Sequence, residues 1–503
     1  MGIVVRQSAK ASLVNYIGVA IGYFNVVYLY PYCLNPEIIG LNKILIDSAI
    51  FLAFFVQLSV PQAAIKFFPF FKDEKQKHHG FFLLLMIFPI IGLLIFGSIF
   101  FLFNSNITTY FITNAKLFTD YIYIILPLTI FITYINILET YATLLLRIAI
   151  PRLIREIVLR LLNILIIVLF YFRILSLSEY ILCLTGIYLL VLILNLFYLS
   201  KVLKISFKPD FKFLDKKLLK QILAFTSFVM ISGIGANIVY KIDVFMISSK
   251  INLANTGIYT IAFYIITIIE IPARAILSII SPIVSESINK KDFANVDALY
   301  KKTALNEFLM GGFLFLLVWI NIDNIFKIMP SGHLYQSGKY VILFLGASKM
   351  IEMLTSINGI ILINSKWYFT WIFFTIYLAI ISIIGNNFLI PIYGIIGSSI
   401  ATLLSIGTYN LFLVMFLWIK MKSHPFSFNQ VKVLAIITIL FLINIFIPNL
   451  NIFYLDSFFR SGVIATFFFL IVYKTKISTE INQIINQTLN LSFIKNLKIF
   501  RNK

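Results

Sequence analysis

Long apolar runs separated by short polar connections dominate the chain. Runs of about 17 to 30 mostly apolar residues recur some fourteen times. Each run is long enough to cross the roughly 30 Å hydrocarbon layer of a bilayer as a helix. The pattern predicts an all-α polytopic membrane protein with about 14 transmembrane helices. The expected spans are 12–34, 41–68, 81–103, 120–145, 157–173, 178–199, 222–249, 256–286, 303–326, 341–363, 368–390, 394–418, 433–447 and 458–473.

Composition supports this prediction, because 60% of the 503 residues are hydrophobic and only 12% are charged. A soluble core of this length could not bury so much apolar material. The first run is too long and too polar within for a cleaved signal peptide, so we expect a retained helix. The two cysteines, Cys33 and Cys183, form no disulfide framework and suit small core positions.

The distribution of basic residues predicts the orientation. The chain has 41 Lys and Arg against 20 Asp and Glu. With the N-terminus inside, 31 of the basic residues lie in cytoplasmic segments and 7 on the opposite side. Lys and Arg near span ends favour the cytoplasmic face, so both termini are expected in the cytoplasm. The basic surplus then reflects orientation and attraction to anionic lipid, and nucleic acid is not needed to explain it.

A long basic connection around Pro209 suggests a division of the chain into two halves. The expected parts are an N-terminal six-helix lobe (1–200), a basic cytoplasmic linker (201–221), a C-terminal six-helix lobe (222–418), helices 13 and 14 (419–473) and a cytoplasmic tail (474–503). The halves echo each other weakly, since Asn35, Gly40 and Ile44 match Asn252, Gly257 and Ile261 at a constant offset of 217. Repeated bundles around a midplane cavity are a common transporter design.

Four stretches carry a family resemblance: LNPEIIGLNKIL, YKIDVFMISSKINLANTGIYTIAF, SPIVSESINKKDFANVDALYKKT and IPIYGIIGSSIATLLS. The last contains a Pro-x-Tyr-Gly-x-x-Gly pattern at Pro391, Tyr393, Gly394 and Gly397. In their order and spacing these stretches resemble the polysaccharide flippases of the multidrug/oligosaccharidyl-lipid/polysaccharide exporter superfamily. Composition and periodicity alone indicate only a polytopic transporter.

The resemblance implies a flippase with two six-helix lobes in a V around a central cavity, and two extra C-terminal helices. Its implied cargo is a polysaccharide repeat unit, such as an O-antigen or capsule unit, on undecaprenyl diphosphate. The expected location is the bacterial cytoplasmic (inner) membrane, with membrane lipids and polysaccharide assembly proteins as further partners. A multidrug/cation antiporter of the same superfamily is the nearer alternative. A glycan polymerase or ligase fits less well, because no outer loop is long enough for a catalytic module.

The stretch TIIEIPARAILSII holds the first candidate residues. Glu270 and Arg274 are four residues apart and share a helix face. Each charge would cost about 2.5–3.5 kcal/mol at the bilayer centre, so we expect both to face a cavity. Pro272 between them is expected to kink the helix and to have a structural or gating role. The alternative is an ion pair that neutralises itself and merely tolerates burial.

Other in-span polar residues extend the candidate cavity. Lys349 and Glu352 are three apart on the expected tenth helix, and Lys241 and Asn237 share a face of the seventh. Asp243, further along the seventh, fits an aspartate of the family motif. Asp243 either contacts the substrate, or it holds a loop or pairs with Lys241.

Asn15 and Asn25 belong to a polar stripe on the first helix that either lines the cavity or packs helices. Glu139, Glu270 and Glu352 are equal candidates for coupling transport to a proton or sodium gradient. In-span acids match or outnumber bases, which departs from the cationic cavity expected of such flippases. No ATP-binding or dinucleotide motif is present, so no cofactor is expected, and a membrane potential with an ion gradient would supply the energy.

Overall fold

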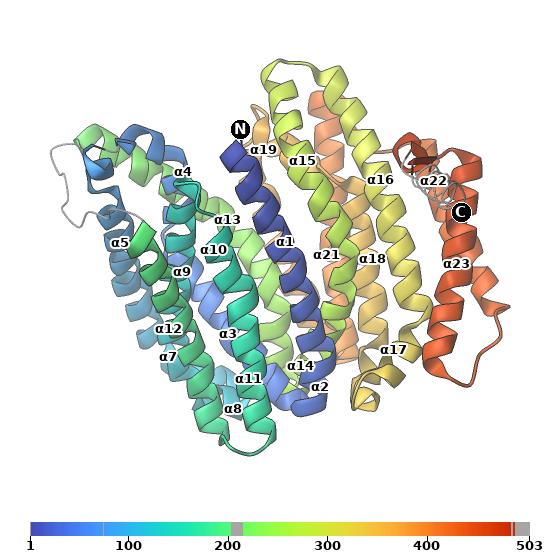
Figure 1. Cartoon of the computed structure of the whole chain (residues 1–503), viewed down its shortest axis with the longest axis horizontal. Helices are drawn as coiled ribbons and strands as arrows, with labels where there is room; N and C mark the ends of the chain where they lie inside the picture. The colour runs from blue at the N-terminus through green and yellow to red at the C-terminus, as the bar shows by residue number, and fades with distance from the viewer. Residues whose placement is uncertain (1, 74, 203–214, 484–485, 488–503) are drawn as a thin grey trace, which may run out of the picture. The chain divides into compact units, whose positions relative to one another are not determined.

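A computed structural model describes residues 2–73, 75–202, 215–483 and 486–487. The described residues fold into helices without strands, which confirms the all-α prediction (Figure 1). Most of the expected linker (203–214) and most of the expected tail (488–503) lie outside the described residues.

Contacts divide the chain into two compact units. Unit 1 comprises Met1–Tyr264 and Thr375–Ser398, and unit 2 comprises Ile265–Phe374 and Ser399–Lys503. The division into lobes 1–200 and 222–418 stays a prediction.

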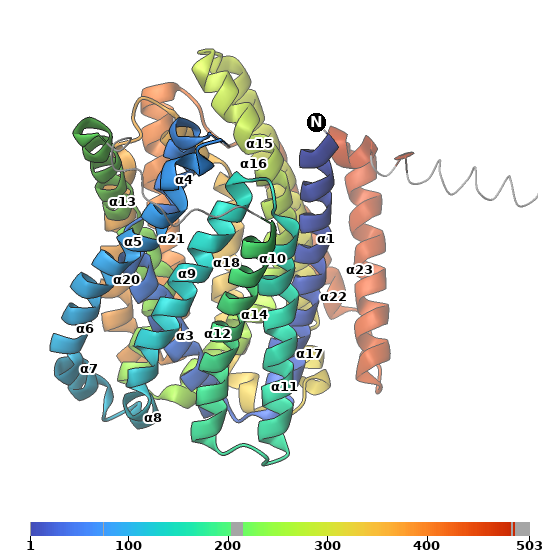
Figure 2. The same ribbon diagram turned by 60° about the vertical axis from the view of Figure 1, so that its left-hand side comes forward.

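The helices of unit 1 include three short π-helical stretches, η1, η3 and η5. In chain order they are α1 (Gly2–Phe24), η1 (Asn25–Leu29), α2 (Tyr30–Cys33), α3 (Pro36–Val56), α4 (Val60–Phe71), η2 (Lys77–Gly80), α5 (Phe81–Gly92), η3 (Leu93–Gly97), α6 (Ser98–Leu102), α7 (Asn104–Phe111), α8 (Lys116–Asp120), η4 (Ile122–Ile124), α9 (Ile125–Leu144), α10 (Ala149–Leu153), η5 (Ile154–Val158), α11 (Leu159–Tyr171), α12 (Leu177–Val202), α13 (Lys216–Lys250) and α14 (Leu253–Ile266), with most of α20 (Thr370–Tyr393). Helices α11 and α12 pack side by side as a hairpin (Figures 1 and 2).

The helices of unit 2 begin where α14 ends. They are η6 (Thr267–Ile269), α15 (Glu270–Asn289), α16 (Phe293–Ile320), α17 (Ile322–Ile328), η7 (Gly332–Gly338), α18 (Lys339–Thr355), α19 (Asn358–Asn364), most of α21 (Ile395–Met421), α22 (Phe428–Ile445) and α23 (Phe453–Thr475). Phe308 of α16, Val433 of α22 and Phe468 of α23 belong to one buried apolar cluster. The last two helices of the chain are therefore packed on α16.

Among the described residues, 12 helices are long and apolar enough to span a membrane. The bent pair of Gly332–Thr355 and Asn358–Asn364 raises this to 13 if it forms one span. The expected span at 157–173 is not among them, because its helix also carries Arg155, Glu156 and Arg160. The multi-pass architecture is confirmed, but the count of 14 is not.

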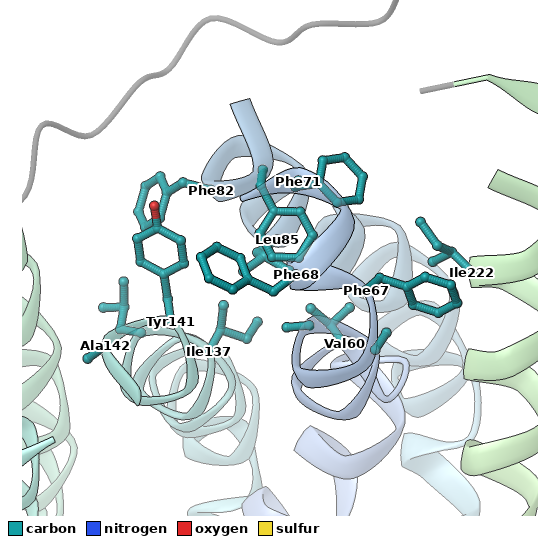
Figure 3. Close-up of a cluster of buried hydrophobic side chains, with 14 of the residues drawn as sticks. Val60, Phe67, Phe68, Phe71, Phe82, Leu85, Ile137, Tyr141, Ala142 and Ile222 are labelled. Atoms are coloured by element: carbon teal, nitrogen blue, oxygen red, sulfur yellow. The ribbon is translucent and has the colours of Figure 1, made fainter. Parts of the chain in front are cut away.

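Helix α4 shows how apolar spacing positions the elements of unit 1. Its buried residues recur at helical intervals of three and four: Val60, Ala63, Ala64, Phe67, Phe68 and Phe71. Figure 3 shows this face over Ile137, Tyr141 and Ala142 of α9, with Phe82 and Leu85 of α5 completing the cluster. The apolar face thus fixes α4 against α9 and leaves its other face free to line a pocket.

The two sequence motifs related by an offset of 217 meet in unit 1. A Cβ atom built on Gly40 would lie 1.9 Å from the carbonyl oxygen of Leu253, and one on Gly257 would lie 1.9 Å from that of Pro36. Pro36 and Leu253 are themselves related by the same offset. The starts of α3 and α14 therefore cross through a reciprocal backbone contact that only glycine permits.

Candidate functional site

A polar pocket of about 320 Å³ lies within unit 1, between the free face of α4, the last turns of α9 and the segment that leads into α10 and η5. Amide and charged side chains dominate its polar lining: Gln57, Gln62, Asn136, Glu139, Arg152 and Arg155. The threonines Thr140 and Thr143 of α9 add two hydroxyls. Interrupted helices are tolerated in membrane proteins where they line a polar cavity of this kind.

One wall of the pocket is built by the break between α3 and α4. Helix α3 ends at Val56, Gln57 caps it, and Leu58 and Ser59 have positive φ angles of 49° and 54°. Pro61 then occupies the first turn of α4, where its missing N–H costs no helical hydrogen bond. This break turns Gln57 and Gln62 toward the same space.

The opposite wall depends on the turn after α9 and on η5. Leu146 has a φ of 58°, which reverses the chain before α10. The π-helical stretch η5 places an extra residue in its turn, and Arg155 lies within it. Such stretches are often found at functional sites.

Hydrogen bonds organise the charges in the pocket. The Arg155 guanidinium donates to Glu139 Oε2 at 2.8 Å and to Asn136 Oδ1 at 3.0 Å. Arg152 donates to Asn15 Oδ1 at 3.2 Å. Two guanidinium groups face one carboxylate, so the pocket carries a net positive charge. Arg155 remains 44% exposed, which leaves donors available for an anion.

Two predicted residues therefore lie at the pocket, Glu139 in its lining and Asn15 next to it. Asn25 is buried in η1 and donates to the Arg160 carbonyl at 3.2 Å, and Arg160 pairs with Glu156 at 2.7 Å. Asn237 donates to the Gly233 carbonyl of its own helix at 3.0 Å. Asn25 therefore links two helices, whereas Asn237 forms a hydrogen bond within its own helix.

Lys241 belongs to a second charged cluster in unit 1. Its Nζ lies 2.5 Å from Asp47 Oδ1, and Lys43 Nζ lies 2.9 Å from Asp47 Oδ2. Asp47 is only 2% exposed, so one buried carboxylate neutralises one of two lysines. The cluster keeps a net positive charge, and Lys43 also faces the Tyr264 ring at 5.9 Å.

Asp243 lies in a different network. Tyr259 donates to its Oδ2 at 2.5 Å and Asn386 to its Oδ1 at 2.9 Å, while Ser398 donates to Asn386 Oδ1 at 2.7 Å. The network joins α13, α14, α20 and α21 within unit 1. These contacts of Asp243 hold four helices together. The ion-pair partner of Lys241 is Asp47.

In unit 2 the structure joins Glu270, Arg274, Lys349 and Glu352 into one charged network. Glu270 accepts from Arg274 at 2.5 Å and pairs with Lys349 at 2.8 Å, and Lys349 donates to Glu352 at 2.7 Å. Two acids and two bases balance each other, and Lys349 is only 8% exposed. Arg274 is 67% exposed. Helix α15 follows η6 directly, and Pro272 is its third residue. The change from 3₁₀ to α-helical geometry therefore lies within one turn before Pro272.

Sequence reasoning missed Arg152 and Arg155, because their position between two apolar runs indicated a cytoplasmic connection. The signal that could have found them is the spacing of Arg152, Arg155 and Arg160 in PRLIREIVLR, at i, i+3 and i+8 among apolar residues, which fits one side of a helix better than a loop.

Comparisons with known proteins agree with this architecture. A family model described as polysaccharide biosynthesis protein matches residues 4–288. No curated protein matches the chain in sequence.

Two solved structures show the fold. The lipid II flippase MurJ in an inward closed conformation has a TM-score of 0.69 at 14% identity, covering 93% of this chain and 99% of its own. An inward-facing multidrug resistance MATE family transporter of the MOP superfamily has a TM-score of 0.60 at 14% identity, covering 82% of this chain and 94% of its own. The chain shares the fold of these transporters, and because the family model covers more than half of it, the chain belongs to the polysaccharide biosynthesis protein family.

Proposed function

We propose that this protein flips a lipid-linked oligosaccharide, an undecaprenyl-diphosphate-linked polysaccharide repeat unit, across the bacterial cytoplasmic membrane by alternating access. Family membership supports a role in polysaccharide synthesis, and the shared fold supports transport. We further propose that no covalent chemistry takes place, since transport needs only binding and a conformational change.

The observation that carries the proposal is the chemistry of the pocket in unit 1. Guanidinium groups bind phosphate oxygens through paired, charge-assisted hydrogen bonds, and Arg152 and Arg155 line the same cavity. The amides of Gln57, Gln62 and Asn136 can donate to and accept from sugar hydroxyls. A sugar diphosphate needs both kinds of partner, and the pocket offers both.

The place of the pocket fits the direction of transport. It lies between the first turns of α4 and the last turns of α9, beside the connection that carries Arg152 and Arg155, and we expect this connection to be cytoplasmic from the distribution of basic residues. A cargo assembled in the cytoplasm would meet this pocket first.

A multidrug/cation antiporter is the second candidate, since one structural neighbour is a multidrug resistance transporter. An organic cation needs an excess of acidic groups around it. Here the single carboxylate of Glu139 is already paired with Arg155, and Arg152 adds another positive charge. The charge of the pocket therefore favours an anionic cargo.

The energy source we propose is the membrane potential together with a proton or sodium gradient. A lipid diphosphate carries about two negative charges, and outward movement of each is favoured by about 2.3 kcal/mol at 100 mV, inside negative. The potential alone then supplies roughly 4–5 kcal/mol per cargo.

The test reconstitutes the purified full-length chain in proteoliposomes with a fluorescent polyprenyl-diphosphate disaccharide. The potential is clamped with valinomycin and potassium, without nucleotide. We expect inside-negative potential to accelerate flipping. Arg155→Ala should slow flipping about tenfold, which corresponds to the loss of one charge-assisted hydrogen bond of about 1.4 kcal/mol.

Arg173→Ala is the matched control, because Arg173 lies in the turn after α11, outside the pocket, and should leave the rate unchanged. Export of an organic cation by the wild type without any flipping of the lipid would instead support the antiporter. A requirement for ATP with indifference to voltage would contradict the proposed energy source.

A further inference from the structure

Glu307 differs from the other buried acids of the chain. Three acidic side chains among the described residues are buried: Asp47, Glu307 and Asp456. Asp47 pairs with two lysines and Asp456 pairs with Arg460. In the part of the chain that the structure describes, no cation lies within ion-pair distance of Glu307.

The carboxyl of Glu307 lies inside unit 2, in the second half of α16. It is 2% exposed, and its Oε1 is buried without a hydrogen-bond partner. The neighbouring hydroxyl is that of Ser356, which is also buried and has no partner of normal hydrogen-bond geometry. Two unsatisfied polar groups therefore lie side by side in an apolar bundle, where each needs a donor or an acceptor.

The charged groups on α16 and on the helices packed against it either form ion pairs with other residues or lie near helix ends. Their ion pairs are Asp297 with Lys301, Glu480 with Lys302, Glu270 with Arg274 and Lys349, Glu352 with Lys349, Glu286 with Lys290, Asp323 with Lys339 and Asp456 with Arg460. Lys327 and Lys474 lie in the last turns of α17 and α23, and Lys432 near the start of α22 lies 5.4 Å from the Phe428 ring. Within the described ranges, none of these groups forms an ion pair with Glu307.

Ser356 is the residue at which the tenth expected span breaks. It lies between α18 and α19, which meet at an angle of 48°, and its φ of 42° and ψ of −111° are rare for a residue with a side chain. The flanking residues Thr355 and Asn358 both donate to Asn410 Oδ1, at 2.9 Å and 2.7 Å. Asn410 therefore satisfies both sides of the break, while Ser356 at its centre faces Glu307.

From this arrangement we propose that Glu307 is a proton-binding site whose ionisation acts on the break at Ser356. A carboxylate that is 2% exposed and has no cation beside it is strongly disfavoured, so the buried state is the neutral acid. The neutral acid can donate its O–H to the Ser356 hydroxyl. The carboxylate can only accept the proton of that hydroxyl, and because its charge is not compensated by a cation, it draws water or a cation into the break. Gain and loss of one proton thus favour different geometries of α18 and α19.

This inference differs from the expected coupling residues. Glu139, Glu270 and Glu352 each pair with a cation, which compensates their charge without a proton. Glu307 has no such partner, and one proton changes its net charge and its hydrogen-bonding capacity together.

Infrared spectroscopy on the full-length protein in lipid nanodiscs tests the site directly. At neutral pH we expect the carbonyl stretch of a protonated carboxylic acid, and we expect Glu307→Gln to remove it. The matched control Glu286→Gln, at an exposed pair with Lys290, should retain the band. A wild-type spectrum from which Glu307→Gln removes no such band would overturn the site.

A second variant keeps the test decisive if Glu307→Gln does not fold. Glu307→Asp retains an acid at the same place, and a shift of the band in this variant identifies it. An unchanged band would refute the assignment.

The role in coupling rests on the proposed flippase function and is measured separately. In proteoliposomes at fixed potential, the ratio of flipping rates with and without a proton gradient should fall to one in Glu307→Gln. Persistence of the wild-type ratio would refute coupling through Glu307 and leave the flippase intact. If even the wild type flips no lipid, the proposed function fails, while the infrared result still decides whether Glu307 binds a proton.

Discussion

Substitution of Gly40 by alanine tests the reciprocal backbone contact between the starts of α3 and α14. The added Cβ would lie 1.9 Å from the Leu253 carbonyl oxygen and 3.0 Å from the Gly257 nitrogen. Carbon and carbonyl oxygen atoms normally approach to about 3.3–3.6 Å. The two helix starts would therefore have to separate by more than about 1 Å.

The expected cost follows from what the new methyl group meets. Overpacking typically costs about 1–3 kcal/mol, and the upper end applies because both opposing atoms are backbone and no rotamer change can relieve the clash. Alanine regains up to about 1 kcal/mol of helix propensity over glycine. We expect Gly40→Ala to lower the stability by about 2 kcal/mol, and Gly257→Ala to do the same through Pro36.

The assay is the apparent thermal midpoint of the purified full-length protein in detergent at one fixed scan rate. Gly186→Ala, also in unit 1, is the matched control, because nothing lies within 4 Å of its added Cβ, and its midpoint should not fall. The Gly40→Ala/Gly257→Ala double variant should lose less than the sum, since one separation accommodates both methyl groups. A midpoint for Gly40→Ala equal to that of Gly186→Ala, or strictly additive losses, would refute the reciprocal contact.

Further predictions concern unit 2, orientation and acid stability. Arg274→Ala should abolish flipping, because we expect this cation to face the cavity. Membrane levels of the variant should stay within about twofold, since the side chain is 67% exposed. Degradation of this variant, with rescue by Glu270→Ala/Arg274→Ala, would indicate a purely structural ion pair. A tag inserted at Gly332 should be accessible from outside the cell, and a tag at the C-terminus should be accessible only from the cytoplasm. The reverse result would contradict the predicted orientation. Burial opposes ionisation of Glu480, but hydrogen bonds from Lys302 and other donors lower its pKa to about 2. Because its unfolded pKa is about 4.3, its contribution is complete above that value and is lost as the pH falls toward 2. Glu480→Gln should weaken this acid dependence of the thermal midpoint, modestly because the side chain is 33% exposed, and an identical pH profile would count against it.

The sequence predicted the membrane architecture well, because apolar length alone identifies a helix that must satisfy its own backbone hydrogen bonds. For Glu270 and Arg274, helical spacing left an ion pair as one of two alternatives, and Lys349 and Glu352 are three residues apart; both form ion pairs in the structure. The contact that joins these pairs, between Glu270 and Lys349, spans 79 residues and depends on how α15 and α18 pack. Periodicity within one helix carries no information about such a contact.

The candidate site was predicted less completely for the same reason. A pair of Lys241 with Asp243 was one of the alternatives, but the partner of Lys241 is Asp47, which lies 194 residues away in the chain. The pocket was missed because two of its walls depend on irregular backbone, namely positive φ angles at Leu58 and Ser59 and the π-helical geometry around Arg155. Irregular geometry of this kind follows from tertiary packing and leaves little trace in a hydrophobic pattern.

The π-helical stretches η1, η3 and η5 have a consequence for how such a chain can change by mutation. Each closes its hydrogen bonds over five residues instead of four, so it holds one residue more than an α-helical turn. Deletion of a single codon within η5 would restore α-helical bonding and rotate α11 by about 100° relative to α10. The helix would stay continuous while Arg160 turned away from Gly18, whose carbonyl it now contacts. Single-residue insertions and deletions at these three places are therefore a route by which related chains could exchange the groups that line a cavity without losing a span.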